Sequence, residues 1–188
     1  MGVTCKLIRL SDGTIDELIE EPVRLAAFFD GERRALTVRP GLMARLRGEK
    51  DRSVQPVTRA RVEDDESDVD KAWHALHYLL TGCAKKSPDV LGFLYSGGTS
   101  MGDGNFGDVR GFRSHEVQTI LRSLQMVAVE NLRARHQPDK MDALGIYPRI
   151  WTRDGTSGLD YILHWFEFLV EFVTRAAEEN QGMLLVIG

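Results

Sequence analysis

The sequence is poor in the features that mark several large classes of protein. It has only two cysteines, Cys5 and Cys83, which have neither metal-site spacing nor the number typical of a disulfide framework. No run reaches the roughly 18 consecutive apolar residues of a membrane span. The opening MGVTCKLIRL lacks the regions of a secretory signal. We therefore expect a protein of the reducing cytoplasm with no membrane partner.

An excess of positive charge is also missing. The 188 residues carry 24 Lys and Arg against 28 Asp and Glu, a formal net charge of −4. This balance gives no overall field that attracts nucleic acid. An apolar content of 43% over this length is enough for a domain with its own core. The composition predicts one domain over residues 1–188 that does not bind nucleic acid.

Motifs for cofactors, metals and nucleophilic catalysis are absent or incomplete. Gly102, Gly104 and Gly107 match G-x-G-x-x-G, but the next expected helix waits until Ser114, too far on to receive a pyrophosphate at its N-terminus. The chain contains no P-loop, no complete EF-hand and no HEXXH, and its one G-x-S-x-G match, Gly98–Gly102, is no nucleophile elbow because the next expected helix begins only at Ser114. The sequence therefore predicts no cofactor and no metal.

The pattern of apolar residues predicts an α+β fold. Strands are expected at 3–10, 90–98, 107–112 and 183–188, and helices around 14–21, 23–30, 70–81, 114–132, 138–144 and 157–180, with Pro22 between the first two. Thr14 with Glu17 suggests a capping box, and Ser114 and Ser157 suggest further helix starts. We expect a small, mostly antiparallel sheet with N- and C-terminal strands, packed by several helices including a long C-terminal one.

The C-terminal helix is apolar on two sides. Its second stripe consists of Tyr161, Trp165, Phe168 and Phe172, spaced by four, three and four residues. Such a helix lies centrally in its own domain or is covered by a partner. The central position is the preferred interpretation, and both a monomer and a homodimer remain open.

Residues 32–67 differ in composition from the rest. Nine Lys and Arg lie between Arg33 and Arg61, and acidic residues follow from Glu63. No aromatic residues alternate with the basic ones, which argues against single-stranded nucleic acid. We expect a charged, partly mobile excursion in which the basic half and the acidic half neutralise each other. The basic half also offers a binding surface for an acidic partner.

The stretch DVDKAWHALHYLLTG at 68–82 concentrates polar side chains at a helix start. It supplies the candidate site residues Asp68, Asp70, Lys71, Trp73, His74 and His77, to which the turn at 146–148 adds Tyr147. In the structural interpretation the acids cap the helix, Trp73 and His77 face the core, and Gly82 ends the helix. In the functional one these side chains form a pocket with the glycine loop at 97–107.

Five segments in order resemble one bacterial family. They are DVDKAWHALHYLLTG, LGFLYSGG, GFRSHEVQTI, MDALGIYPRIW and the stretch from GLDYILHWF to the end. Together they resemble the YfbM-like family, a domain of unknown function. The resemblance covers nearly the whole chain, with 32–67 matching least. It implies a single α+β domain and gives no catalytic residue.

Two functions follow as hypotheses. The first is a non-enzymatic cytoplasmic binding protein with a protein partner, acting as an adaptor or an immunity protein. It rests on the missing catalytic motifs, the aromatic stripe and the charged excursion. The alternative is a small enzyme in which Lys71, His74, His77 and Tyr147 supply acid and base groups and Asp68 or Asp70 an orienting charge.

Overall fold

The core of the molecule is a five-stranded antiparallel sheet. The computed structural model describes residues 2–30, 36–38, 43, 47–54, 66–102 and 107–188. The strands follow the order β4-β1-β7-β6-β5, and each neighbouring pair is antiparallel. Their bounds are β1 Cys5–Leu10, β4 Glu66–Asp68, β5 Thr99–Ser100, β6 Asp108–Phe112 and β7 Gly182–Ile187. The expected sheet with N- and C-terminal strands is confirmed, and these two strands pair at its centre.

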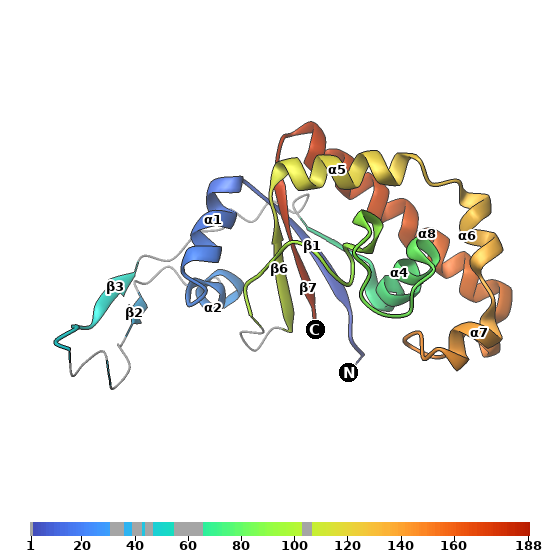
Figure 1. Cartoon of the computed structure of the whole chain (residues 1–188), viewed down its shortest axis with the longest axis horizontal. Coiled ribbons are helices and arrows are strands. Elements are labelled where there is room, and N and C mark those ends of the chain that lie inside the picture. The colour runs from blue at the N-terminus through green and yellow to red at the C-terminus, as the bar shows by residue number, and fades with distance from the viewer. Residues whose placement is uncertain (1, 31–35, 39–42, 44–46, 55–65, 103–106) are drawn as a thin grey trace.

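Helices cover both faces of this sheet. Leu7 and Leu185 point into the core beneath α4 (Trp73–Thr81), α5 (Ser114–Gln125) and α8 (Trp151–Glu178). Ile8 and Leu184 point into a second core beneath α1 (Asp12–Glu20) and α2 (Arg24–Asp30). Successive side chains on a strand alternate between its faces. Because both faces are covered, every residue of β7 is buried, which explains its unbroken apolar sequence (Figure 1).

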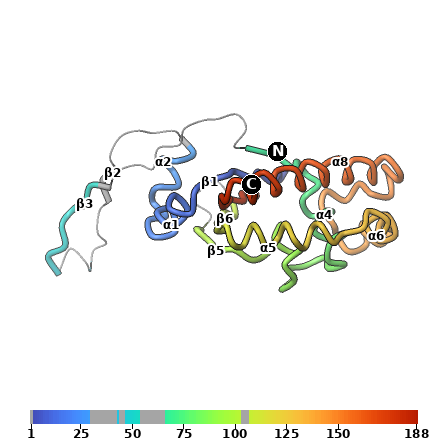
Figure 2. The backbone as a smooth tube through the Cα atoms, turned by 90° about the horizontal axis from the view of Figure 1, so that it is seen from above, coloured from blue at the N-terminus to red at the C-terminus, as the bar shows by residue number. Residues whose placement is uncertain are grey.

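The C-terminal helix α8 lies centrally, as expected, with α5 running alongside it (Figure 2). The uninterrupted part of the helix begins after Gly155, close to the predicted start at Ser157, and a short helical segment from Trp151 precedes it, which the sequence did not predict. The Asp142 carboxylate accepts the backbone N–H groups of Trp151 and Thr152. A cap supplied from α7 (Pro138–Ala143) is not visible in the local sequence, and the helix passes a non-helical Gly155 before the expected start.

Two other predicted helix starts are also corrected. Ser11, not Thr14, caps α1, and its Oγ accepts the Thr14 N–H at 3.2 Å. Ser114 lies inside α5, and its hydroxyl donates to Asp12 Oδ2 at 2.7 Å. The predicted helix over 114–132 is two helices, since α5 ends at Gln125 and α6 spans Val129–Arg135.

The segment 90–98, predicted as a strand, is instead a turn. It contains the 3₁₀ helix η3 (Val90–Gly92), which begins where the Asp89 carboxylate accepts the Leu91 N–H at 2.8 Å. A continuous apolar run does not separate a buried strand from a buried turn by periodicity alone. The glycines at 97 and 98 then have φ values of 80° and 65°, which turn the chain into β5.

The expectation of a mobile excursion at 32–67 falls largely outside the described residues. The described parts include a two-stranded hairpin of β2 (Leu36–Val38) and β3 (Arg52–Val54), which the sequence analysis missed. Arg52 forms an ion pair with Glu21 just after α1. At the end of this stretch, β4 joins the edge of the main sheet. Within the described ranges, none of the helices is long and apolar enough to cross a bilayer.

Candidate functional site

The residues nominated at the start of α4 gather with Tyr147 around the chain's N-terminal segment. The Trp73 ring stacks against His74 and Tyr147, with centroids 5.0 and 6.2 Å away. Trp73 Nε1 donates to the Val3 carbonyl at 3.3 Å, and the Val3 N–H donates to Tyr147 Oη at 2.8 Å. We call Trp73, His74, His77, Tyr95 and Tyr147 the α4 cluster. It holds the strand that leads into β1.

Both histidines of the α4 cluster are engaged with backbone groups. His74 Nδ1 accepts the Tyr147 N–H at 3.0 Å, and its Nε2 donates to the Ala84 carbonyl at 2.9 Å. His77 is fully buried, and its Nε2 donates to the Lys85 carbonyl at 2.8 Å. Burial lowers the pKa of both imidazoles, so both are neutral at pH 7.

The two aspartates before α4 have different structural partners. Asp68 Oδ1 accepts the backbone N–H of Asp70, but neither the 3₁₀ turn at 70–72 nor α4 has a side-chain cap, so the expected capping by either acid was wrong. Asp70 has a φ of 45° at the start of η2 (Asp70–Ala72), and its Oδ2 accepts the Tyr161 hydroxyl at 2.7 Å. Burial, together with that hydrogen bond, raises the pKa of Tyr161. Burial also raises the pKa of Asp68.

The helix start and the glycine loop border different cavities. Asp70 and Lys71 line a cavity of about 290 Å³ together with Trp151, Asp154 and Tyr161 of α8. The glycines at 97 and 98 line another cavity, described below. Residues 103–106 of the loop lie outside the described ranges. The nominated residues therefore come together around Val3 and at the flank of α8, without the glycines of the loop.

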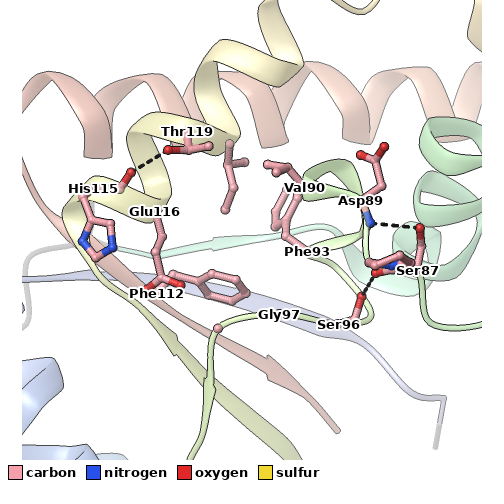
Figure 3. A pocket seen from close by; sticks show the side chains of 13 residues that line it. Ser87, Asp89, Val90, Phe93, Ser96, Gly97, Phe112, His115, Glu116 and Thr119 are labelled. Atoms are coloured by element: carbon pink, nitrogen blue, oxygen red, sulfur yellow. Dashed lines mark hydrogen bonds between the residues drawn. The ribbon is translucent and has the colours of Figure 1, made fainter.

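A second cavity, of about 360 Å³, lies between the η3 turn and α5 (Figure 3). We call it the η3–α5 pocket. Its walls include the side chains of Phe93, Phe112 and Ile120, all of which are nearly buried. Val90 stands at the opening, with 40% of its surface exposed. Cavities of about 300–1,000 Å³ with mainly apolar walls and a few polar groups are typical of binding sites.

A buried arginine fixes one wall of the η3–α5 pocket. Arg110 on β6 is only 4% exposed, and its guanidinium donates to the carbonyls of Phe93 and Leu94, each at 2.9 Å. Its Nε pairs with Asp108 at 3.0 Å. A guanidinium offers five N–H donors in a planar arrangement, so one arginine side chain can bind several backbone carbonyls at once. The wall is therefore set before any ligand arrives.

Polar groups around the pocket are mostly used inside the protein. The Thr119 hydroxyl donates to the His115 carbonyl at 2.9 Å, and the Ser96 hydroxyl donates to the Ser87 carbonyl at 2.6 Å. Glu116 Oε2 accepts the N–H of Arg113 at 2.8 Å. What faces a ligand is an apolar surface with carboxylates and an imidazole at its border (Figure 3).

Sequence reasoning did not find this pocket. Its residues come from the η3 turn, the end of β6 and the first half of α5, which are brought together only by the fold. One signal was available, because Arg110 stands among small and apolar residues in the DVRGF segment. A lone arginine in a buried strand must find carbonyl or carboxylate partners. For metals, no group of three or more His, Cys, Asp or Glu suitable for a site occurs within the described residues.

The fold and these two regions define a small α+β protein without a recognised catalytic constellation among the described residues. A family model described as a domain of unknown function (DUF1877) matches residues 1–186, so the chain belongs to that family. Among solved structures, the chain is similar to a protein of unknown function, YfbM from Escherichia coli. The two share 18% identity over 98% of this chain and 99% of that one, with a TM-score of 0.68. No curated protein matches.

The predicted membership of a YfbM-like family is thus confirmed. At 18% identity the likeness to YfbM shows the shared fold. Neither match has an assigned activity, so any function must be argued from the residues of this chain.

Proposed function

We propose that this protein is a non-enzymatic binding protein that takes an apolar side chain of a partner protein into the η3–α5 pocket. One observation carries the proposal. The pocket keeps an apolar wall open while its own hydroxyls and Glu116 are already hydrogen-bonded within the chain. A site of this kind gains free energy by removing apolar surface from water, which is how a buried anchor residue stabilises an interface.

The enzymatic alternative draws on acid and base groups of which most are already engaged, although His77 Nδ1 is buried with no hydrogen-bond partner among the described residues. His74 and His77 donate to backbone carbonyls, Tyr147 Oη accepts from Val3, and Asp70 accepts from Tyr161. A general base must reach the proton that it removes. Engaging these groups in catalysis would break hydrogen bonds that hold the N-terminal segment and α8. This supports the binding function over the enzymatic one.

Charge at the border of the pocket indicates the partner's chemistry. The lining contains the carboxylates of Asp89 and Glu116 together with His115, and it includes neither lysine nor arginine. An apolar anchor with a basic residue beside it would complement this arrangement, because opposite charges at an interface rim favour association and fix orientation. The proposed partner segment therefore carries an aromatic or branched aliphatic side chain next to Lys or Arg.

The setting proposed for this function is the reducing cytoplasm, with residues 1–188 acting as one unit. Cys5 and Cys83 are both free thiols. Burial raises the pKa of Cys5, which keeps its thiol protonated and unreactive. The charged stretch at 32–67 offers a second, electrostatic contact for an adaptor or an immunity protein, and no membrane or nucleic acid enters this proposal.

Photo-crosslinking from the pocket tests the function. A benzophenone amino acid replaces Val90 at the pocket opening or, as the control, Met126, which is 84% exposed at the end of α5. We expect a single protein to crosslink in cells from position 90 and not from position 126. With that protein purified, Thr119→Trp should fill the pocket and weaken binding at least about tenfold, while Met126→Trp should leave it unchanged.

Two results would contradict the proposal. One is the absence of any crosslinked protein from position 90. The other is a crosslinked protein whose affinity is the same for Thr119→Trp and for the unaltered chain, with circular dichroism confirming that the variant is folded.

A further inference from the structure

The outer side of α8 carries a second apolar hollow, distinct from the η3–α5 pocket. It lies between α6 and α8, has a volume of about 380 Å³ and includes Val129, Leu163 and Val170 in its lining. Arg133 of α6 stands at one side, and Glu167 and Glu171 of α8 stand at the other. We call it the α6–α8 groove. It lies at the end of the molecule opposite the β2–β3 hairpin (Figure 1).

An exposed aromatic ring of α8 lines a neighbouring hollow that shares Glu171 with this groove. Phe168 follows Glu167 on α8 and is 44% exposed, and its ring lies against His164 and Trp165 at centroid distances of 4.9 and 5.7 Å. The rest of the aromatic stripe is less available. Phe172 is nearly buried, and the hydroxyl of Tyr161 is bound to Asp70. The stripe thus reduces to one protruding ring, which is linked to the groove through Glu171, a residue that borders both hollows.

Charges bordering the groove are of both signs and lack partners in the described part of the chain. Arg133, Glu167 and Glu171 are exposed, and none of them forms an ion pair or a side-chain hydrogen bond with another described residue. Arg133 and Glu167 thus offer a cation and an anion on the same face. A surface of this kind can satisfy its charges by meeting its own copy.

We propose that the α6–α8 groove is the interface of a two-fold symmetric homodimer. In this arrangement Phe168 of each subunit enters the groove of the other, and Arg133 of each subunit pairs with Glu167 of the partner subunit. A two-fold interface uses the same patch twice, so it requires a protrusion, a hollow and both signs of charge on one surface. All three are present here. A foreign partner would not require them together.

Charge exchange provides a sharp test by sedimentation velocity. Arg133→Glu alone places two acids opposite each other twice in the dimer, and Glu167→Lys alone does the same with two bases. Each variant should therefore sediment as a monomer where the unaltered chain is a dimer. An equimolar mixture should dimerise again, because both pairs across the interface then have opposite signs. The control Met126→Glu should remain dimeric.

Removal of the protruding ring tests the packing separately. Phe168→Ala should raise the dissociation constant of the dimer roughly tenfold or more, as loss of an interface anchor does. The proposal is overturned if the unaltered chain is monomeric at all soluble concentrations, if Phe168→Ala dimerises unchanged, or if the mixture of charge variants stays monomeric. Circular dichroism verifies that each variant is folded. Since Thr119 and Val90 lie outside this surface, the outcome is independent of partner binding at the η3–α5 pocket.

Discussion

The α4 cluster and the η3–α5 pocket show opposite uses of polar and aromatic residues. The cluster draws attention in the sequence, yet its histidines, Trp73 and Tyr147 bond to backbone groups. The pocket is built from ordinary residues such as Phe93, Val90 and Thr119, and it leaves apolar surface open. A concentration of chemically versatile side chains is therefore a poor guide to function where each has a structural partner. The open apolar surface is the better guide.

The largest effect is expected from the arginine that supports the pocket wall. Arg110→Met leaves the buried carbonyls of Phe93 and Leu94 without donors, each unsatisfied group costing about 1–3 kcal/mol. We expect the free energy of unfolding to fall by about 3 kcal/mol, measured by urea titration. The control is Arg153→Met, whose exposed ion pair with Asp154 should contribute nothing measurable. Equal stability of the two variants would mean that Arg110 does not hold the wall.

Substitutions at two glycines compare the crowded wall of the η3–α5 pocket with the uncrowded end of α4. Gly82 ends α4 with a φ of 75°, and a Cβ there would meet nothing within 4 Å. Gly98, with a φ of 65°, would place a Cβ 2.8 Å from the Gly111 carbonyl and 2.9 Å from the Phe112 ring. Gly82→Ala should cost about 1–2 kcal/mol through its backbone conformation, and Gly98→Ala about 1–3 kcal/mol more through overpacking.

The same urea titration measures both glycine variants. A cost for Gly98→Ala no greater than that for Gly82→Ala would show that the pocket wall yields easily. The claim that the η3–α5 pocket has a rigid wall would then be wrong.

A smaller effect concerns the neutral histidines of the α4 cluster. Burial lowers their pKa in the folded state, so below about pH 6.5 the unfolded chain binds more protons. Their contribution to stability is complete above that pH and is lost as the pH falls toward the folded-state pKa. We expect a gentler loss of stability below about pH 6.5 in His77→Gln. Urea titrations at several pH values check this, with exposed His115→Gln as the control.

The sequence alone predicts the sheet and most helices, because their signals are local or periodic. The apolar strand at 183–188, the central C-terminal helix and the glycine that ends α4 all follow this rule. Errors arise where a distant residue decides. Asp142 holds the short segment that precedes the kink of α8, Asp12 holds Ser114, and Arg110 helps make a turn of the apolar segment 90–98.

The candidate residues at 68–77 and Tyr147 are close in space, as their nomination implies, but spacing cannot show which hydrogen bonds they make. The η3–α5 pocket could not be predicted from the sequence for a different reason. Its three contributing segments share no motif, and their meeting depends on the packing of α5 against the η3 turn.

The central claim is that the η3–α5 pocket is open to an apolar ligand while the α4 cluster is closed. The most direct test is a two-dimensional NMR titration with benzamidine, a small aromatic cation that matches the apolar wall and acidic border of the pocket. The account predicts saturable shifts at Phe93, Phe112 and Ile120 that disappear in Thr119→Trp, with Trp73 and His77 unmoved. Shifts centred on Trp73, His77 and Tyr147, or no saturable shift at the pocket, would contradict it.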